Sequence, residues 1–214
     1  MTTKDLSLTH LIRPSTSKDK APLILMLHGY GSDENDLFSF ANELPEKYMI
    51  ISLKAPYTLQ PYGNAWYAIN FDAEQKKFSD IEQAILSRDS VVKFIKEAIQ
   101  SYPIDANNIT MLGFSQGAIL SFALGLSYPN LVKNIIGLSG YIDPLMLKPG
   151  YETTHFEQLN VYKSHGSVDQ VIPVEWARQN KPFLENLGIE VTYEEYPVGH
   201  GINPQNFQSF KSWL

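Results

Sequence analysis

The sequence contains no cysteine. Disulfide bonds, thiolate zinc sites and cysteine nucleophiles are therefore excluded. The five histidines also lack the paired H-x-x-x-H spacing of helical metal sites. We therefore expect a protein that uses neither a metal ion nor another cofactor.

Clusters of positive charge are also lacking. The chain has 17 Lys and Arg against 23 Asp and Glu, a net charge of −6, and its longest basic run is Lys76-Lys77. Such a balance argues against nucleic acid or an anionic membrane surface as a partner. No apolar run is long enough for a membrane span, and the residues after Met1 are too polar for a signal peptide. We expect a cytoplasmic protein.

Segments rich in β-forming residues alternate with helical patterns along all 214 residues. Strands are expected at 6–12, 21–27, 49–53, 109–112, 134–139, 161–165 and 190–196. Helices are expected at 36–44, 79–101, 116–129, 173–187 and 203–214. This alternation predicts one α/β domain over residues 1–214, with a mostly parallel, doubly wound sheet flanked by helices. The irregular stretch 141–160 is too short for a large cap domain.

The most informative motif is Gly113-x-Ser115-x-Gly117, between an apolar strand and an apolar helix. A serine nucleophile stands on a tight strand-to-helix turn, where larger side chains two residues away would collide with neighbouring backbone. The pattern predicts that Ser115 is a catalytic nucleophile. A purely structural Gly-Ser turn is the alternative.

A serine nucleophile needs a base, usually histidine. We predict His200, because it follows the last strand and lies between two glycines. The other histidines are His10, His28, His155 and His165.

The base in turn needs a carboxylate. Asp169 follows a strand and gives the order Ser…Asp…His. Asp143 also follows a strand, but the order together with the spacing along the chain favours Asp169. Asp169 could instead be a turn or helix-capping residue.

An oxyanion formed during ester hydrolysis needs two N–H donors. One is expected from the backbone of Gln116, directly after the nucleophile. The other is expected from the backbone of Tyr30, in the His28-Gly29-Tyr30-Gly31 segment after a central strand. That segment could also be a strand-exit turn without a catalytic part.

The stretch 54–78 is expected to be a long loop that holds several aromatic residues, and loops this long inside a compact domain are usually functional. These residues are Tyr57, Tyr62, Trp66, Tyr67, Phe71 and Phe78. We predict that they form the walls of a substrate pocket with Leu145, Met146 and Leu147, and that Trp66 is the main one. Ordinary core packing is the alternative.

Taken together, these segments resemble the carboxylesterase/phospholipase-type α/β-hydrolases, which include acyl-protein thioesterases and small bacterial carboxylesterases. The matching text is L-H-G-Y-G at 27–31, A-W-Y at 65–67, G-F-S-Q-G-A at 113–118, H-G-S-V-D-Q-V-I-P at 165–173 and G-H at 199–200. The resemblance implies an α/β-hydrolase fold and cofactor-free hydrolysis of esters or thioesters. It also implies a Ser115–Asp169–His200 triad, with Tyr30 and Gln116 as oxyanion donors.

We expect a carboxylesterase for short-to-medium acyl chains, because the 141–160 region leaves little room for an elaborate lid. An acyl-protein thioesterase or lysophospholipase is the alternative with the same chemistry. A non-catalytic binding protein on this fold is the alternative of a different class. The expected partner is a small ester or thioester; an exposed apolar edge could also support a homodimer, although nothing in the sequence requires one.

Overall fold

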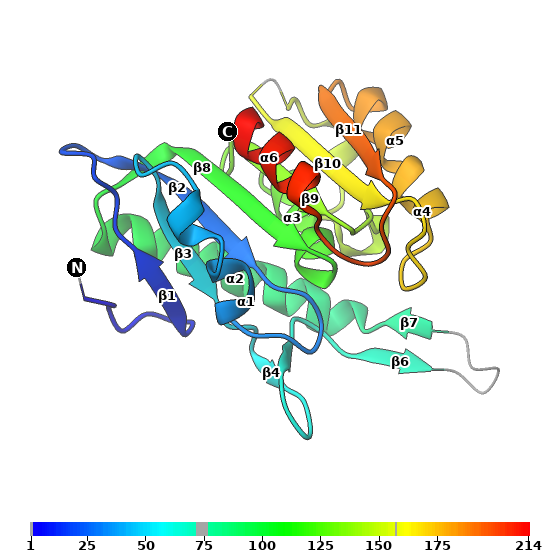
Figure 1. Cartoon of the computed structure of the whole chain (residues 1–214), viewed down its shortest axis with the longest axis horizontal. Helices are drawn as coiled ribbons and strands as arrows, with labels where there is room; N and C mark the ends of the chain where they lie inside the picture. Colours follow the sequence, from blue (N-terminus) through cyan, green and yellow to red (C-terminus); the bar gives the residue numbers. More distant parts are fainter. Residues whose placement is uncertain (1, 72–76, 157) are drawn as a thin grey trace.

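The computed structural model describes residues 2–71, 77–156 and 158–214, and its centre is a seven-stranded sheet (Figure 1). In spatial order the strands are β1 (His10–Arg13), β3 (Met49–Leu53), β2 (Ala21–Leu27), β8 (Ile104–Phe114), β9 (Asn134–Leu138), β10 (Asn160–Gly166) and β11 (Val191–Tyr196). Edge strand β1 is antiparallel to β3, and every other pair is parallel. The predicted mostly parallel sheet is confirmed.

Both faces of the sheet are covered, which explains why β2 is continuously apolar. Alternate residues of β2 join two separate cores: Leu23 and Leu25 belong to one, and Ile24 and Met26 to the other. Residues of α2 (Ile81–Ser101), α3 (Gln116–Ser127) and α5 (Asn180–Asn186) fill the first core. Residues of α1 (Asn35–Phe38) and α6 (Pro204–Trp213) fill the second. Figure 1 shows α1 and α6 in front of the sheet and α2 behind it.

Two predicted helices are broken. The expected helix at 36–44 is α1 followed by a separate 3-10 turn, η1 (Ala41–Glu43). The expected helix at 173–187 is divided into α4 (Val174–Arg178) and α5. The break follows from Pro182, which has no N–H to donate to the carbonyl of Arg178 and whose ring would clash with it.

The predicted long loop at 54–78 contains two small antiparallel sheets. One pairs β4 (Tyr57–Thr58) with β5 (Asn64–Ala65), and the other pairs β6 (Ile69–Phe71) with β7 (Lys77–Ser79). Part of that predicted loop, 72–76, lies outside the described residues. The segment between β9 and β10 carries only the 3-10 turns η2 (Pro144–Met146) and η3 (Tyr151–Thr153) in its described part. No described helix is long and apolar enough to cross a membrane.

The carboxyl ends of the parallel strands meet at one edge of the sheet. Ser115 follows β8 directly, and Asp169 and His200 lie in the segments after β10 and β11. Binding crevices form at this edge in open α/β sheets.

Candidate active site

Ser115 lies at the apex of a sharp turn between β8 and α3. Its backbone has φ of +53°, a region that non-glycine residues rarely adopt. A Cβ atom at Gly113 would lie 2.4 Å from the carbonyl oxygen of Gly117, and one at Gly117 would lie 2.0 Å from that of Leu27. Only glycine fits at these two positions, as the motif predicts. The Ser115 amide donates to the carbonyl of Leu138, which attaches the turn to β9.

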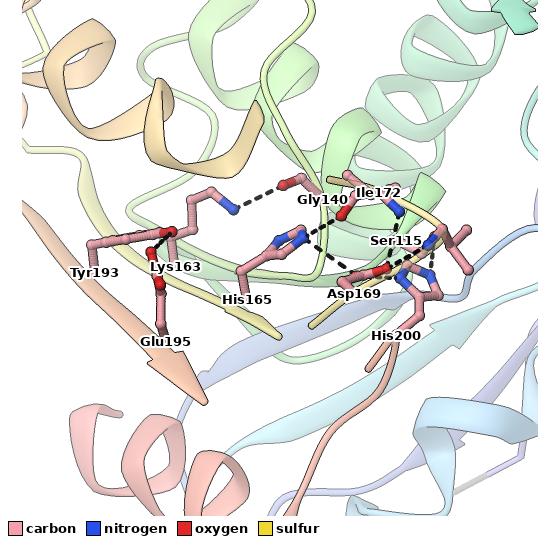
Figure 2. Close-up of polar contacts among 10 residues, drawn as sticks. Ser115, Gly140, Lys163, His165, Asp169, Ile172, Tyr193, Glu195 and His200 are labelled. Atoms are coloured by element: carbon pink, nitrogen blue, oxygen red, sulfur yellow. Dashed lines mark hydrogen bonds and ion pairs between the residues drawn. The ribbon is translucent and has the colours of Figure 1, made fainter. Parts of the chain in front are cut away.

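The side chains of Ser115, His200 and Asp169 form a hydrogen-bonded line (Figure 2). His200 Nε2 lies 2.9 Å from Ser115 Oγ, and His200 Nδ1 lies 2.7 Å from Asp169 Oδ2. Since a carboxylate only accepts, Nδ1 carries a proton and Nε2 is free to accept one from the serine hydroxyl. The His200 ring also packs against Phe114, with 5.0 Å between ring centroids.

Asp169 is held by more than His200. Its other oxygen, Oδ1, accepts hydrogen bonds from the amides of Val171 at 2.8 Å and Ile172 at 3.0 Å. Burial acts to raise the pKa of this carboxyl, but the hydrogen bonds from His200, Ile172 and Val171 outweigh it and lower the pKa below its ordinary value. The carboxylate is therefore charged at neutral pH.

The rival carboxylate Asp143 has a different partner. Its Oδ1 accepts from the Leu145 amide at 3.0 Å, which caps η2. Among the described histidines only His200 bonds to Ser115. His10 and His28 are buried elsewhere, His165 is buried on the other side of Asp169 with Nε2 3.3 Å from its Oδ2, and His155 is exposed. The described residues contain no group of three or more His, Asp or Glu side chains that could hold a metal ion.

The two predicted oxyanion donors are the backbone amides of Tyr30 and Gln116, and both residues lie next to Ser115. Tyr30 and Gln116 line the same cavity as Ser115 and His200. A Cβ atom at neighbouring Gly29 would lie 3.3 Å from the Ser115 Cβ, so the chain after β2 passes directly by Ser115. Neither amide donates a hydrogen bond to another described group, and both are free to bind an oxyanion.

Hydrogen bonds from three sides hold the chain after β2. Buried His28 accepts from the Ala55 amide through Nε2, so its Nδ1 carries the proton and donates to Gly29 O at 2.7 Å. Burial lowers the pKa of His28, which keeps the ring neutral. The indole Nε1 of Trp66 donates to the carbonyl of His28 at 2.9 Å. These hydrogen bonds attach the segment to Ala55 and to Trp66.

The Gln116 side chain connects the nucleophile turn to the aromatic segment. Its Oε1 accepts from the Trp66 amide at 2.8 Å, and its Nε2 donates to the Tyr67 carbonyl at 2.8 Å. Ser87 in α2 donates to the Trp66 carbonyl as well. Gln116 thus has a structural function beyond the oxyanion contact that its position predicts.

A cavity of about 560 Å³ opens beside Ser115 and His200. Most of its wall is apolar, and Leu145, as predicted, is part of it. The further lining residues are Tyr67, Ile69, Ser79, Ile81, Ile119, Tyr141, Asp143, Val171, Ile172 and Trp176.

Several predicted wall residues do not line this cavity: Tyr57, Tyr62, Trp66, Met146 and Leu147. The side chains of Phe71 and Phe78 lie outside the described part of the structure. The Trp66 side chain is fully buried and does not reach the cavity, and its indole N–H donates a hydrogen bond to the His28 carbonyl. Met146 is also fully buried in the core, one residue after exposed Leu145. The prediction for Trp66 and Met146 is corrected, because aromatic and sulfur-containing side chains fill a core as readily as a pocket.

Several wall residues were missed, although the sequence contains signals for some of them. Ile119 lies in the first turn of α3, and its amide bonds to the carbonyl of Ser115 four residues earlier, which keeps the two residues close together. Val171 and Ile172 belong to the segment that carries Asp169. Tyr67 was not missed, because it is one of the predicted aromatic wall residues and does line the cavity. Nothing local marks Trp176 as a wall residue.

A sequence model of the Phospholipase/Carboxylesterase family matches residues 10–214. The chain belongs to this family. The family includes carboxylesterases and acyl-protein thioesterases, and the enzyme class predicted from the sequence, a carboxylic ester hydrolase, agrees with it. The predicted family resemblance is confirmed.

Individual relatives are distant. Acyl-protein thioesterase 1 of Mycosarcoma maydis is 24% identical, over 96% of this chain and 95% of that protein. A probable carboxylesterase SOBER1-like of Arabidopsis thaliana is 30% identical over 52% of this chain, and the match spans only 43% of that relative's length. The crystal structure of the Bacillus cereus carboxylesterase has a TM-score of 0.84 at 22% identity, over 96% of this chain and 92% of that chain. This likeness confirms the predicted α/β-hydrolase fold.

Proposed function

We propose that this protein hydrolyses carboxylic esters with short-to-medium acyl chains through an acyl-enzyme intermediate. Ser115 is the nucleophile, His200 the general base and acid, and Asp169 the carboxylate that orients His200. The observation that supports this most is the hydrogen-bonded line from Asp169 through His200 to Ser115, which ends at a mostly apolar cavity.

The reaction has two halves. Ser115 Oγ attacks the ester carbonyl carbon while His200 Nε2 takes the hydroxyl proton, and the amides of Tyr30 and Gln116 bind the oxyanion. The intermediate collapses, the C–O bond to the alcohol breaks, and His200 returns the proton to the leaving oxygen. A water molecule then attacks the acyl-serine with His200 again as base, which releases the carboxylic acid and restores Ser115. No step needs a cofactor.

The size and surface of the cavity support a modest acyl chain. A volume of about 560 Å³ lies within the range of small-molecule sites. Apolar residues such as Leu145, Ile119 and Val171 in its wall favour an alkyl chain.

Labelling with a fluorophosphonate probe tests the proposal, because the probe reacts only with an activated serine. Wild-type protein should be labelled and should hydrolyse p-nitrophenyl esters. Ser115→Ala should lose labelling and lower kcat by on the order of 10⁶. Ser121→Ala is the matched control: Ser121 is buried on α3, the helix that begins directly after Ser115, its hydroxyl donates to Gly117 O, and labelling should persist. Near-wild-type turnover by Ser115→Ala would exclude the assignment.

An acyl-protein thioesterase or lysophospholipase is the second candidate. The match to Acyl-protein thioesterase 1 of Mycosarcoma maydis along nearly the whole chain favours it. Turnover of p-nitrophenyl esters and of acyl thioesters with increasing acyl-chain length separates the two candidates. A preference for long acyl thioesters would favour the thioesterase over the carboxylesterase. A non-catalytic binding protein would leave the probe unreacted.

We further propose that residues 1–214 form a single α/β-hydrolase domain. One cooperative unfolding transition, seen alike by two spectroscopic probes, would support this. The homodimer and the cytoplasmic location stay predictions.

A further inference from the structure

Two buried basic side chains of β10 have no part in the proposed mechanism. Lys163 and His165 are two residues apart and therefore point to the same face of the sheet. Lys163 is fully buried and His165 is 2% exposed. Figure 2 shows His165 between Lys163 and Asp169.

The contacts of His165 determine where its proton lies. Nε2 is 2.9 Å from the Ile172 carbonyl oxygen and 3.3 Å from Asp169 Oδ2, and both atoms are acceptors. Nε2 must therefore carry a hydrogen. Nδ1 is buried and has no hydrogen-bond partner among the described residues. A second proton there would be an unsatisfied donor on a buried cation, so the ring is neutral.

His165, Ile172 and Asp169 form a closed set of contacts. The Ile172 amide donates to Asp169 Oδ1, the Ile172 carbonyl accepts from His165, and His165 Nε2 faces Asp169 Oδ2. Each peptide or side chain in this set limits the movement of the other two. The carboxylate is thereby held in the orientation that its contact with His200 Nδ1 requires.

We propose that His165 is a positioning residue for the triad, which orients Asp169 without reducing the negative charge that acts on His200. A cationic side chain in its place would form an ion pair with Asp169 and compete with protonated His200. A neutral donor avoids this competition. The inference rests on the function proposed above.

The surroundings of His165 favour its neutral form. Burial lowers the pKa of His165, and the charges of Lys163 and His200 lower it further. The hydrogen bond to the Ile172 carbonyl and the charge of Asp169 raise it, but the pKa stays below its ordinary value. Lys163 itself donates from Nζ to Gly140 O at 2.8 Å and faces Glu195 and Tyr193 of β11. Even a partly protonated Lys163 opposes a second charge on His165.

His165→Leu and His165→Gln test the proposal in ester hydrolysis. The Gln amide nitrogen is as many bonds from Cβ as His Nε2 and can donate to the same acceptors, whereas Leu cannot. His165→Leu should lower kcat on the order of tenfold with KM nearly unchanged. His165→Gln should restore most of kcat. Equal kcat in both folded variants, or a change in KM alone, would overturn the proposal.

His10 supplies the matched control. It is also buried, and its Nδ1 and Nε2 contact Leu8 O and the Tyr102 hydroxyl away from the cavity. His10→Leu should lower the thermal midpoint but leave kcat unchanged. Loss of activity in Ser115→Ala together with full activity in His165→Leu would reject the inference and keep the proposed function.

Nitrogen NMR of the wild-type protein is a test that needs no variant. The His165 ring should show the neutral Nε2–H form from pH 6 to pH 8. A cationic ring in that range would overturn the proposal, whatever the kinetics of the variants.

Discussion

A Cβ atom at Gly117 would lie 2.0 Å from the carbonyl oxygen of Leu27, so α3 begins in direct contact with the end of β2. The start of α3 cannot move away from β2, because the Ser115 amide donates a hydrogen bond to the carbonyl of Leu138 in β9. Backbone packing therefore holds Ser115 next to the segment that carries Tyr30.

Gly117→Ala should either prevent folding or displace Ser115 from His200. We expect kcat to fall at least a hundredfold and the thermal midpoint to drop, because either the helix or β2 must move. Gly201→Ala is the matched control, since no atom of the described residues, apart from Gly201 and its two chain neighbours, lies within 4 Å of its Cβ position. Thermal unfolding and probe labelling of both variants would show the difference; unimpaired labelling of Gly117→Ala would contradict this account of the turn.

Trp66 should matter for stability and not for acyl-chain length. Trp66→Phe removes the donor to His28 O and should cost about 1–3 kcal/mol of unfolding free energy. Trp66→Ala should cost about 3–5 kcal/mol, because a large fully buried side chain is removed. Urea unfolding and a chain-length series on each variant measure the two effects. A changed chain-length preference in a stable Trp66→Phe variant would return this residue to the cavity wall.

Replacement of Leu145 should change KM only for esters with longer acyl chains. Its side chain is 70% exposed at the cavity, so replacement should leave the fold intact. Leu145→Ser should raise KM for medium-chain esters roughly threefold and leave acetate esters unaffected, because only a longer chain reaches the apolar wall. The same change at Leu86, which is 62% exposed on α2 and does not line the cavity, serves as the comparison. Equal effects of the two variants on KM would remove Leu145 from the substrate path.

Lys163 should make stability rise with pH. Burial lowers its pKa from 10.5 to about 7, against the opposing effect of Glu195. Between pH 7 and pH 10 the unfolded chain retains the lysine proton while the folded chain loses it, so the free energy of unfolding increases with pH. Below pH 7 both states are protonated and the fold bears the full cost of a buried charge.

The check is urea unfolding of wild type and Lys163→Met at pH 7, 8, 9 and 10. The wild type should gain on the order of 1–4 kcal/mol relative to the variant across this range. If the free energy of unfolding changed with pH equally in the two proteins, Lys163 would keep its ordinary pKa in the folded state.

The sequence by itself determined the sheet and the turn that carries Ser115. The run at 21–27 is apolar at every position because a strand buried on both faces has no solvent side, and the observed β2 has these bounds. The glycine at 113 reflects local backbone crowding, because a Cβ atom there would meet the carbonyl of Gly117 only four residues along the chain. Properties of this kind depend on a few neighbouring residues, which is why a linear pattern can predict them.

Only the tertiary structure decided which side chains meet. Asp143 and Asp169 both follow strands, and the fold brings Asp169, 31 positions away in sequence, to His200 while Asp143 caps η2. Trp66 and Met146 look like wall residues in the sequence, yet packing of the cores buries them behind the cavity. The contacts of His165 depend on the path of the chain from β10 to Ile172. Such contacts arise from the register of the strands and the packing of the segments between them, to which residues from the whole chain contribute.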